Sequence, residues 1–385
     1  MNTYRDNDAK HIIMGALVFV ASIIFLVALD FKQILELFDH TPPEEFATET
    51  YETYHTVDEV AARLQEEIMN GNTSCTFYLE NITSDDITQI NNMIDPTYGT
   101  AANQETYMDF AGKKDNTEKI TLRIELSPAY FVYANILYGK PLPSGNSKAQ
   151  RLLEETKTAL AVIDEDMSDY QKELKLHDYL IRNCKYSETY SHAKTSDIYN
   201  AFGALVDKKA VCDGYAQAMQ LLLTCAGVTS KYVSGTATSS SKTMNHAWNM
   251  VQLKDEWYHL DATWDDPVPD MGKFSTHAYF NVTDDFISGS HTWDTTKYPQ
   301  AASKKMNYYA KKKQRFSSWK KYKAASYKAL VNKGKPIYEA YIGKRKVTKD
   351  DFKFLYKKTS DYEKHYSWNM VEEKKGNVLI LTAQE

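Results

Sequence analysis

Three residues in the second half of the chain have the types and the order needed to activate a cysteine nucleophile. Cys212, His246 and Asp261 supply a thiol, an imidazole and a carboxylate. In such a site the thiolate attacks, the imidazole accepts and returns a proton, and the carboxylate fixes the tautomer of the imidazole. These three residues are therefore the candidate catalytic residues.

The segment after Cys212 predicts a helix that would favour the thiolate. The run from Cys212 to Cys225 is rich in helix-forming residues, and Gly227 is a suitable end signal. A helix N-terminus carries partial positive charge and free N–H groups, which stabilise a thiolate and can bind the oxyanion of an acyl-transfer intermediate. The alternative fate of a free cysteine is that of a small core residue, and Cys225, beside Leu221–Leu223, is interpreted in that way.

The other two candidates are predicted on adjacent strands. The chain from His246 to Trp264 reads as two strands around a tight polar turn. A turn of two residues, 254 and 255, places His246 diagonally across from Asp261 on one face of the sheet, within reach of a side-chain hydrogen bond. A three-residue turn would place the two side chains on opposite faces.

Two alternatives use a further histidine of this region. His259 shares the alternation of Asp261 and is a second candidate for the working imidazole. A metal site built from Cys212, His246, His259 and Asp261 has suitable residue types, but no closely spaced pair of ligands supports it. The polar, turn-rich segment 234–245 is predicted to be a loop, either a solvated connection or a mobile rim of the substrate cleft.

The segments around the three candidates resemble the transglutaminase-like superfamily, a papain-related group of cysteine enzymes. The resemblance covers roughly residues 150–285 and rests on order, spacing and flanking residues. Its motifs are Ala210–Ala216, Tyr232–Gly235, His246–Val251 and Trp257–Asp266. Many members of the group have a glycine at the position of Ala210, a departure that removes no reactive group.

The resemblance implies an α+β fold in which a papain-like nucleophile helix packs on an antiparallel sheet. It makes Cys212 the nucleophile, His246 the general base and acid, and Asp261 the orienting carboxylate, with no metal or organic cofactor. The implied reaction is attack on a carboxamide or peptide bond of a protein or peptide, through a thioester at Cys212, with acyl transfer to an amine or water. Two alternatives remain: a cysteine peptidase or amidase of cell-wall or surface peptides, and a non-catalytic scaffold with a vestigial enzyme domain.

An apolar segment near the N-terminus predicts a membrane anchor. Residues 12–29 carry no charge and are long enough to span a bilayer as a helix. Arg5 and Lys10 precede this run, which favours a cytoplasmic tail over residues 1–11 and an extracytoplasmic catalytic domain. A cleaved signal peptide is the alternative, although no clear cleavage site follows. We therefore expect a single-pass protein of the cell membrane, with an acidic linker over 30–55. Because the catalytic domain would lie outside the cell, nucleic acid is not an expected partner.

The remaining chain is long enough for two or three domains. We predict a small α+β module over 56–140, the catalytic domain over 147–300 and a basic α+β module over 301–385, with a faint sequence echo between the two flanking modules. Four cysteines are too few for a disulfide framework, which fits a bacterial surface enzyme, although pairing of Cys75 with Cys184 stays open.

Positive charge is concentrated in the C-terminal part. Residues 301–358 contain 19 lysines and arginines against 3 acidic residues, whereas the whole chain has a net charge of −5. Such a segment is either a solvated lysine-rich surface or a contact for an anionic wall polymer or lipid.

Overall fold

The computed structural model describes residues 51–70, 72–81, 83, 103–114, 117–188, 197–239, 242–266, 276–356 and 365–384. These residues fall into two compact units, with the boundary between Leu126 and Ser127. The predicted tail (1–11), anchor (12–29) and most of the linker (30–55) lie outside the described residues. Within the described part of the chain, no helix is long and apolar enough to cross a membrane.

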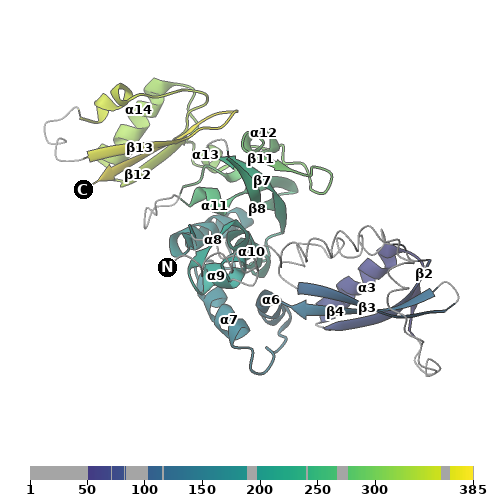
Figure 1. The fold of residues 1–385 in the computed structure, drawn as a ribbon. Coiled ribbons are helices and arrows are strands. Elements are labelled where there is room, and N and C mark those ends of the chain that lie inside the picture. Colours follow the sequence, from purple (N-terminus) through teal and green to yellow (C-terminus); the bar gives the residue numbers. More distant parts are fainter. Residues whose placement is uncertain are drawn as a thin grey trace, which may run out of the picture. The chain divides into compact units, whose positions relative to one another are not determined.

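The first unit is a four-stranded sheet with one described helix (Figure 1). The strand order is β1-β2-β4-β3, and Val60 and Leu64 of the amphipathic helix are buried. Its elements are β1 (Thr53–Tyr54), α3 (Val57–Asn70), β2 (Ser74–Glu80), β3 (Asn103–Lys114) and β4 (Thr117–Leu126).

The predicted end of this first module at residue 140 is wrong. The helix that follows β4, Pro128–Tyr138, belongs to the second unit. Ala129 and Val132 of that helix are buried in the core around the Cys212 helix. The reason is that this helix is strongly apolar and buries its side chains against the helices that follow it in the chain.

The second unit contains the three candidate residues. It begins with helices α6 (Pro128–Tyr138), α7 (Ser147–Leu160), α8 (Asp169–Asn183), α9 (Ala201–Leu205) and α10 (Cys212–Cys225), with the short elements β5 (Lys185–Tyr186), η1 (Asp197–Tyr199) and β6 (Lys209–Ala210). A five-stranded antiparallel sheet follows, in the order β10-β9-β8-β7-β11. Its elements are β7 (Ser230–Ser239), β8 (Lys242–Leu253), β9 (Glu256–Leu260), α11 (Ala262–Asp265), β10 (Phe280–Val282), α12 (Asp284–Ile287) and β11 (His291–Trp293).

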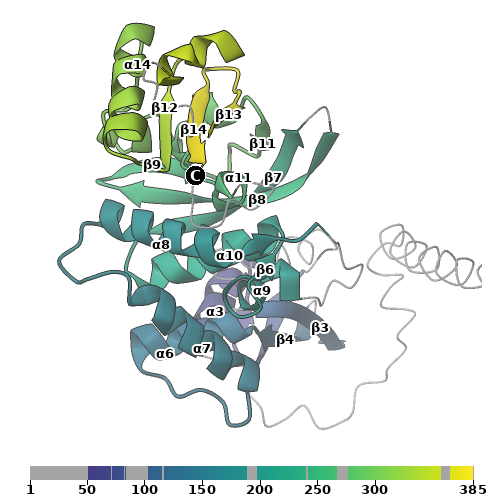
Figure 2. The same cartoon turned by 90° about the vertical axis from the view of Figure 1, so that its left-hand side faces the viewer.

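The five-stranded sheet is covered on both faces (Figure 2). Because side chains alternate along a strand, β8 sends Val251 and Leu253 into the core of helices α7–α10. It sends Trp248 and Met250 into a second core that includes Val378 of the C-terminal sheet. Helix and sheet packing of this kind gives the α+β arrangement expected from the sequence.

The C-terminal region is a three-stranded antiparallel sheet with helical segments. The sheet order is β12-β14-β13. The elements are α13 (Tyr308–Lys311), α14 (Trp319–Tyr327), η2 (Lys328–Asn332), β12 (Ile337–Tyr341), η3 (Lys349–Tyr356), β13 (His365–Val371) and β14 (Val378–Gln384). Since Val378 and Ile380 share a core with Trp248, this region and the part predicted as the catalytic domain form one compact unit, not two.

The two flanking sheets share a topology. In each, the strand that follows the helix and a later strand lie on either side of the last strand, which pairs antiparallel with both. The first sheet has an additional strand, β1, which pairs in parallel with β2. The series is α3, β2, β3, β4 in the first unit and α14, β12, β13, β14 in the second. This correspondence agrees with the sequence echo between the two modules.

Candidate active site

Cys212 is the first residue of α10, as the sequence predicts. The N-cap residue, Val211, has an apolar side chain and makes no capping hydrogen bond, so it satisfies none of the first-turn N–H groups. Gly214 permits the start of this helix to press against the preceding segment, because a Cβ there would lie 2.6 Å from the carbonyl oxygen of Ile198. The Cys212 thiol is free and partly exposed at this helix end.

The hairpin that carries the other two candidates has the predicted two-residue turn. Leu253 pairs with Glu256, and Lys254 and Asp255 both have positive φ angles, of 51° and 64°. Two consecutive residues with positive φ are typical of the tight hairpin turn whose twist matches the strands. The register on which the His246–Asp261 prediction depends is therefore confirmed.

Asp261 lies at the start of a short helix and not within a strand. The prediction that the second strand runs to Trp264 is wrong, since β9 ends at Leu260 and Asp261 is the N-cap of α11. One carboxylate oxygen, Oδ1, accepts hydrogen bonds from the backbone N–H groups of Thr263 (2.9 Å) and Trp264 (3.1 Å). This cap holds the carboxylate in one orientation and leaves Oδ2 to face the sheet.

The other oxygen of Asp261 binds two imidazoles. Nε2 of His246 lies 2.7 Å from Oδ2, and Nε2 of His291 lies 3.0 Å from the same atom. The Cys212 side chain lies close enough to the His246 imidazole to help raise its pKa, and Nδ1 is the ring nitrogen that Asp261 does not use. The structure thus brings together all three residues singled out from the sequence and adds a fourth, His291.

The charges of the site stabilise one another. Burial would lower the pKa of His246, but the charge and hydrogen bond of Asp261, with a contribution from Cys212, raise it to about 10. Burial would raise the pKa of Asp261, but His246 and His291 hold it well below its ordinary value. At neutral pH the site therefore contains a carboxylate, and His246 is an imidazolium next to the cysteine, which is the arrangement that activates cysteine nucleophiles.

His259 is not the working imidazole. Its Nδ1 accepts a hydrogen bond from the indole of Trp248 (2.9 Å), and its Nε2 lies 2.8 Å from a carboxylate oxygen of Asp284. Because both ring nitrogens are used, the alternative metal site that includes His259 is not assembled either. Among the described residues, His246, Asp261 and His291 do form a group with metal-ligand spacing, and all three are already joined by hydrogen bonds.

The predicted loop over 234–245 is a β-hairpin. Strands β7 and β8 pair from Ser230 with Val251 to Ser239 with Lys242. Gly235 lies opposite His246 and lets a neighbouring strand approach, since a Cβ there would lie 2.2 Å from the carbonyl oxygen of Thr292. The sequence missed these strands because serine and threonine favour turns when they occur in runs, while ladder pairing with β8 and β11 decides the outcome here.

A second cluster of histidines and carboxylates lies in the same unit, away from Cys212 in the hydrogen-bond network. Asp178 accepts from His177 (3.4 Å) and from His277 (2.9 Å). The other nitrogen of His177 lies 3.2 Å from Asp265, and the other nitrogen of His277 binds Glu339 of β12 at 2.5 Å. This cluster was not found from the sequence, because its members come from distant segments without a shared motif.

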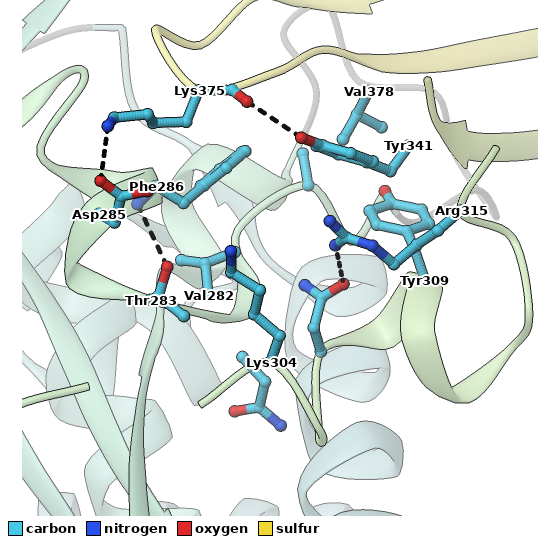
Figure 3. A pocket seen from close by; sticks show the side chains of 13 residues that line it. Val282, Thr283, Asp285, Phe286, Lys304, Tyr309, Arg315, Tyr341, Lys375 and Val378 are labelled. Atoms are coloured by element: carbon cyan, nitrogen blue, oxygen red, sulfur yellow. Dashed lines mark hydrogen bonds and ion pairs between the residues drawn. The ribbon is translucent and has the colours of Figure 1, made fainter. Parts of the chain in front are cut away.

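A cationic pocket lies where the turn between β13 and β14 meets α12 (Figure 3). It is open to solvent and is lined by Lys304, Arg315 and Lys375 among others, with Asp285 as the one acid in its lining. Asp285 is paired with Lys375 at 2.8 Å, and Arg315 donates to the neutral Asn307 at 3.3 Å. Two of the three cations of the pocket are therefore not paired with an acid in its lining.

Comparison with known proteins identifies the part of the chain that contains the site. Residues 156–262 match the transglutaminase-like superfamily. Kyphoscoliosis peptidase of Mus musculus is 26% identical over 159 residues, which cover 36% of this chain and 24% of the mouse protein. The same peptidase of Homo sapiens is 25% identical over 159 residues, with the same coverage. The chain thus spans about a quarter of the length of these curated relatives.

Two solved structures show a weak overall likeness. A structure described as a TGase is 13% identical with a TM-score of 0.24, covering 55% of this chain and 59% of the other. The periplasmic domain of TgpA from Pseudomonas aeruginosa is 15% identical with a TM-score of 0.22, covering 41% and 62%. Scores of this size add nothing to the sequence match. The match, together with a helix that begins at Cys212 and packs on an antiparallel sheet, shows that the chain contains a transglutaminase-like domain.

Proposed function

We propose that this protein is a cysteine enzyme that transfers acyl groups from carboxamide or peptide bonds through a thioester at Cys212. The observation that carries the proposal is the position of the His246 imidazole, which binds the carboxylate of Asp261 through Nε2 (2.7 Å) and lies close enough to Cys212 for that residue to help raise its pKa. The thiol lies at the start of a helix whose cap side chain leaves its first N–H groups unsatisfied.

The proposed reaction begins with attack of the Cys212 thiolate on the carbonyl carbon of the substrate. The carbonyl oxygen becomes an oxyanion, which the N–H groups at the start of α10 stabilise. His246 gives its Nδ1 proton to the leaving nitrogen, the carbon–nitrogen bond breaks, and a thioester remains on Cys212. The neutral imidazole then takes a proton from the acceptor, an amine or water, which attacks the thioester and releases the thiolate.

The substrate class follows from this chemistry, and the acceptor decides the outcome. A glutamine side chain with an amine acceptor gives a crosslink, whereas a peptide bond with water gives cleavage. The second reaction is the peptidase or amidase alternative, and the two relatives named above, both called peptidases, favour it. Both outcomes pass through the same thioester, so one assay can detect either.

The test is a peptide panel with a fluorescent primary amine, analysed by mass spectrometry. Peptides that contain glutamine are incubated with the full chain, with and without the amine, and three products are sought: the amine conjugate, the hydrolysed peptide and an acylated Cys212 peptide. Cys212→Ala is the control, with a thermal melt to show that it folds. Acylated Cys212 with either product supports the proposal.

The scaffold alternative makes the opposite prediction. Absence of an acyl adduct on Cys212 with every peptide, together with full biological activity of the Cys212→Ala protein, would overturn the enzymatic proposal and favour a vestigial domain.

We further propose that the enzyme is anchored in the cell membrane by residues 12–29 with its catalytic domain outside, on the support of the uncharged apolar run in the sequence.

We also propose that the cationic pocket binds the phosphate groups of an anionic wall polymer or lipid. Support comes from Lys304 and Arg315, which line the pocket, and from the excess of basic residues over 301–358. A double variant, Lys304→Ala with Arg315→Ala, should bind less to a phosphodiester polymer or to anionic vesicles. Weaker binding to the polymer would identify a wall polymer as the ligand, and weaker binding to the vesicles would identify a lipid. Lys320→Ala removes an exposed lysine of the same region as a control. Equal binding by all three proteins would contradict the proposal.

A further inference from the structure

The catalytic carboxylate is linked to the C-terminal sheet by a continuous series of hydrogen bonds. His291 binds Asp261 through Nε2 (3.0 Å), and its Nδ1 lies 2.8 Å from the hydroxyl oxygen of Ser290. That hydroxyl lies 2.6 Å from Oε1 of Glu373, which also accepts from the hydroxyl of Tyr279 at 2.7 Å. Glu373 belongs to the turn between β13 and β14, outside the segment that matches the superfamily.

Burial, local space and an ion pair all hold Glu373 in this position. The side chains of Asp261, His291 and Glu373 are all buried, with exposed fractions of 0%, 2% and 8%. Gly289 provides the space for the carboxylate, because a Cβ there would lie 2.2 Å from Oε2 of Glu373. The turn itself is held next to α12 by the ion pair between Lys375 and Asp285 at 2.8 Å.

The proton positions in this series are mutually dependent. Ser290 has one hydroxyl hydrogen and donates it to the carboxylate of Glu373, so its oxygen is left to face Nδ1 of His291. The other ring nitrogen, Nε2, faces the carboxylate of Asp261. Glu373 thereby fixes the orientation of the His291 ring, which contacts Asp261 at the same oxygen as His246.

We propose that Glu373 is a positioning residue of the active site, which acts on Asp261 through Ser290 and His291 and makes the C-terminal sheet part of the catalytic machinery. This inference rests on the proposed function of Cys212. Asp261 held between the imidazoles of His246 and His291 keeps one orientation, and with it the orientation of His246 next to Cys212. The role of the C-terminal turn is to complete the site and not to bind the substrate.

The test compares variants by the rate at which iodoacetamide alkylates Cys212 and by kcat on a substrate of the wild-type protein. Glu373→Ala should lower the alkylation rate and kcat by about tenfold each, while KM stays unchanged. A tenfold effect corresponds to a typical interaction energy between neighbouring residues of one hydrogen-bond network. Glu373→Gln should recover part of the loss, because its amide oxygen can still accept the two hydroxyl groups. Glu372→Ala is the matched control, since this exposed acid lies in the same turn.

A second variant acts on the same contact from the other side. Gly289→Ala should reproduce the loss by displacing the end of the Glu373 side chain, and the double variant with Glu373→Ala should lose no more than either alone. Additive losses, or alkylation and kcat unchanged in folded Glu373→Ala protein, would overturn the inference. Slow alkylation of Cys212 in the wild-type protein would instead count against the proposed function itself, so the two failures are distinct.

Discussion

Two clusters of histidines and carboxylates lie in the same unit of the protein and differ in what their ring nitrogens contact. In the second cluster both nitrogens of His177 and both nitrogens of His277 bind carboxylates. In the first, His246 uses one nitrogen for Asp261 and lies close enough to Cys212 for that residue to help raise its pKa. The two clusters therefore differ in the partner of the second ring nitrogen. In the second cluster that partner is another carboxylate, whereas His246 of the first cluster has a cysteine nearby.

The second cluster has the features of a structural connection. It joins α8 through Asp178, the segment before β10 through His277, and β12 through Glu339. The ring of Tyr308 stacks on His277 at a centroid distance of 3.8 Å, which closes one face of the imidazole. Breaking this cluster should affect stability, whereas breaking the first should affect catalysis, and each prediction below tests that division.

The largest expected effect is on catalysis, in Asp261→Asn. Asparagine can still cap α11, but it lacks the charge that holds His246 protonated and oriented, so kcat should fall by about 10⁴-fold. Steady-state kinetics on any substrate of the wild-type protein measures this. The matched change in the second cluster, Asp265→Asn, should leave kcat of the folded protein unchanged. Equal losses in the two variants would remove the distinction between the clusters.

The next effect is on stability, in His277→Ala. This change leaves the buried Glu339 and the partly exposed Asp178 without their shared partner, which should cost about 3 kcal/mol of unfolding free energy. Urea unfolding measures the loss, and kcat in the absence of urea should stay close to the wild-type value. A kcat reduced as strongly as in Asp261→Asn would show that the second cluster takes part in the reaction.

The stability of the folded protein should fall as the pH rises, because His277 of the second cluster has a raised pKa. Burial would lower the pKa of His277, but Glu339 and Asp178 raise it from 6.5 to about 10. A raised pKa means that the folded state binds the proton more tightly, so this stabilisation is complete below pH 6.5 and is lost as the pH rises towards 10. The melting temperature should fall over this range and fall less steeply in His277→Ala. An identical slope in both proteins would contradict the assignment.

The smallest effect is expected at His259, the histidine that was an alternative from the sequence. Asp284→Asn removes the carboxylate partner of its Nε2, and Asp284 is about one third exposed, so the cost should be about 1 kcal/mol. Alkylation of Cys212 and kcat should not change. A clear loss of activity would bring His259 back as a candidate for the working imidazole.

The sequence predicts the parts of the site that depend on local structure. The helix that begins at Cys212 follows from its residue propensities, and the two-residue turn follows from the alternation on both sides of it. His291 and Glu373 could not be predicted, because their roles arise only when β11 pairs with β7 and the C-terminal turn packs on α12. The strand pairing of 234–239 was missed for a related reason, since the tertiary partner overrides a turn-like composition.

The extent of the modules also depends on tertiary packing. The predicted boundary at residue 140 differs from the observed one at Ser127 because Val132 packs into the core around α10. The local sequence near Ser127 does not show that this helix packs against residues far along the chain. Similarly, the alternation of β14 predicts a strand but does not show that Val378 packs against the five-stranded sheet that contains β8.

The most direct test of the central claim is the reactivity of Cys212 towards iodoacetamide between pH 4 and pH 9, with the labelled cysteine identified by mass spectrometry. Cys184 and Cys225 serve as internal references, because burial raises the pKa of each thiol to about 12. We predict rapid labelling of Cys212 at pH 6 in the wild-type protein and loss of that labelling in His246→Ala. Slow labelling with a midpoint near the ordinary thiol value of about 8.5, the same in both proteins, would contradict an activated cysteine at this site.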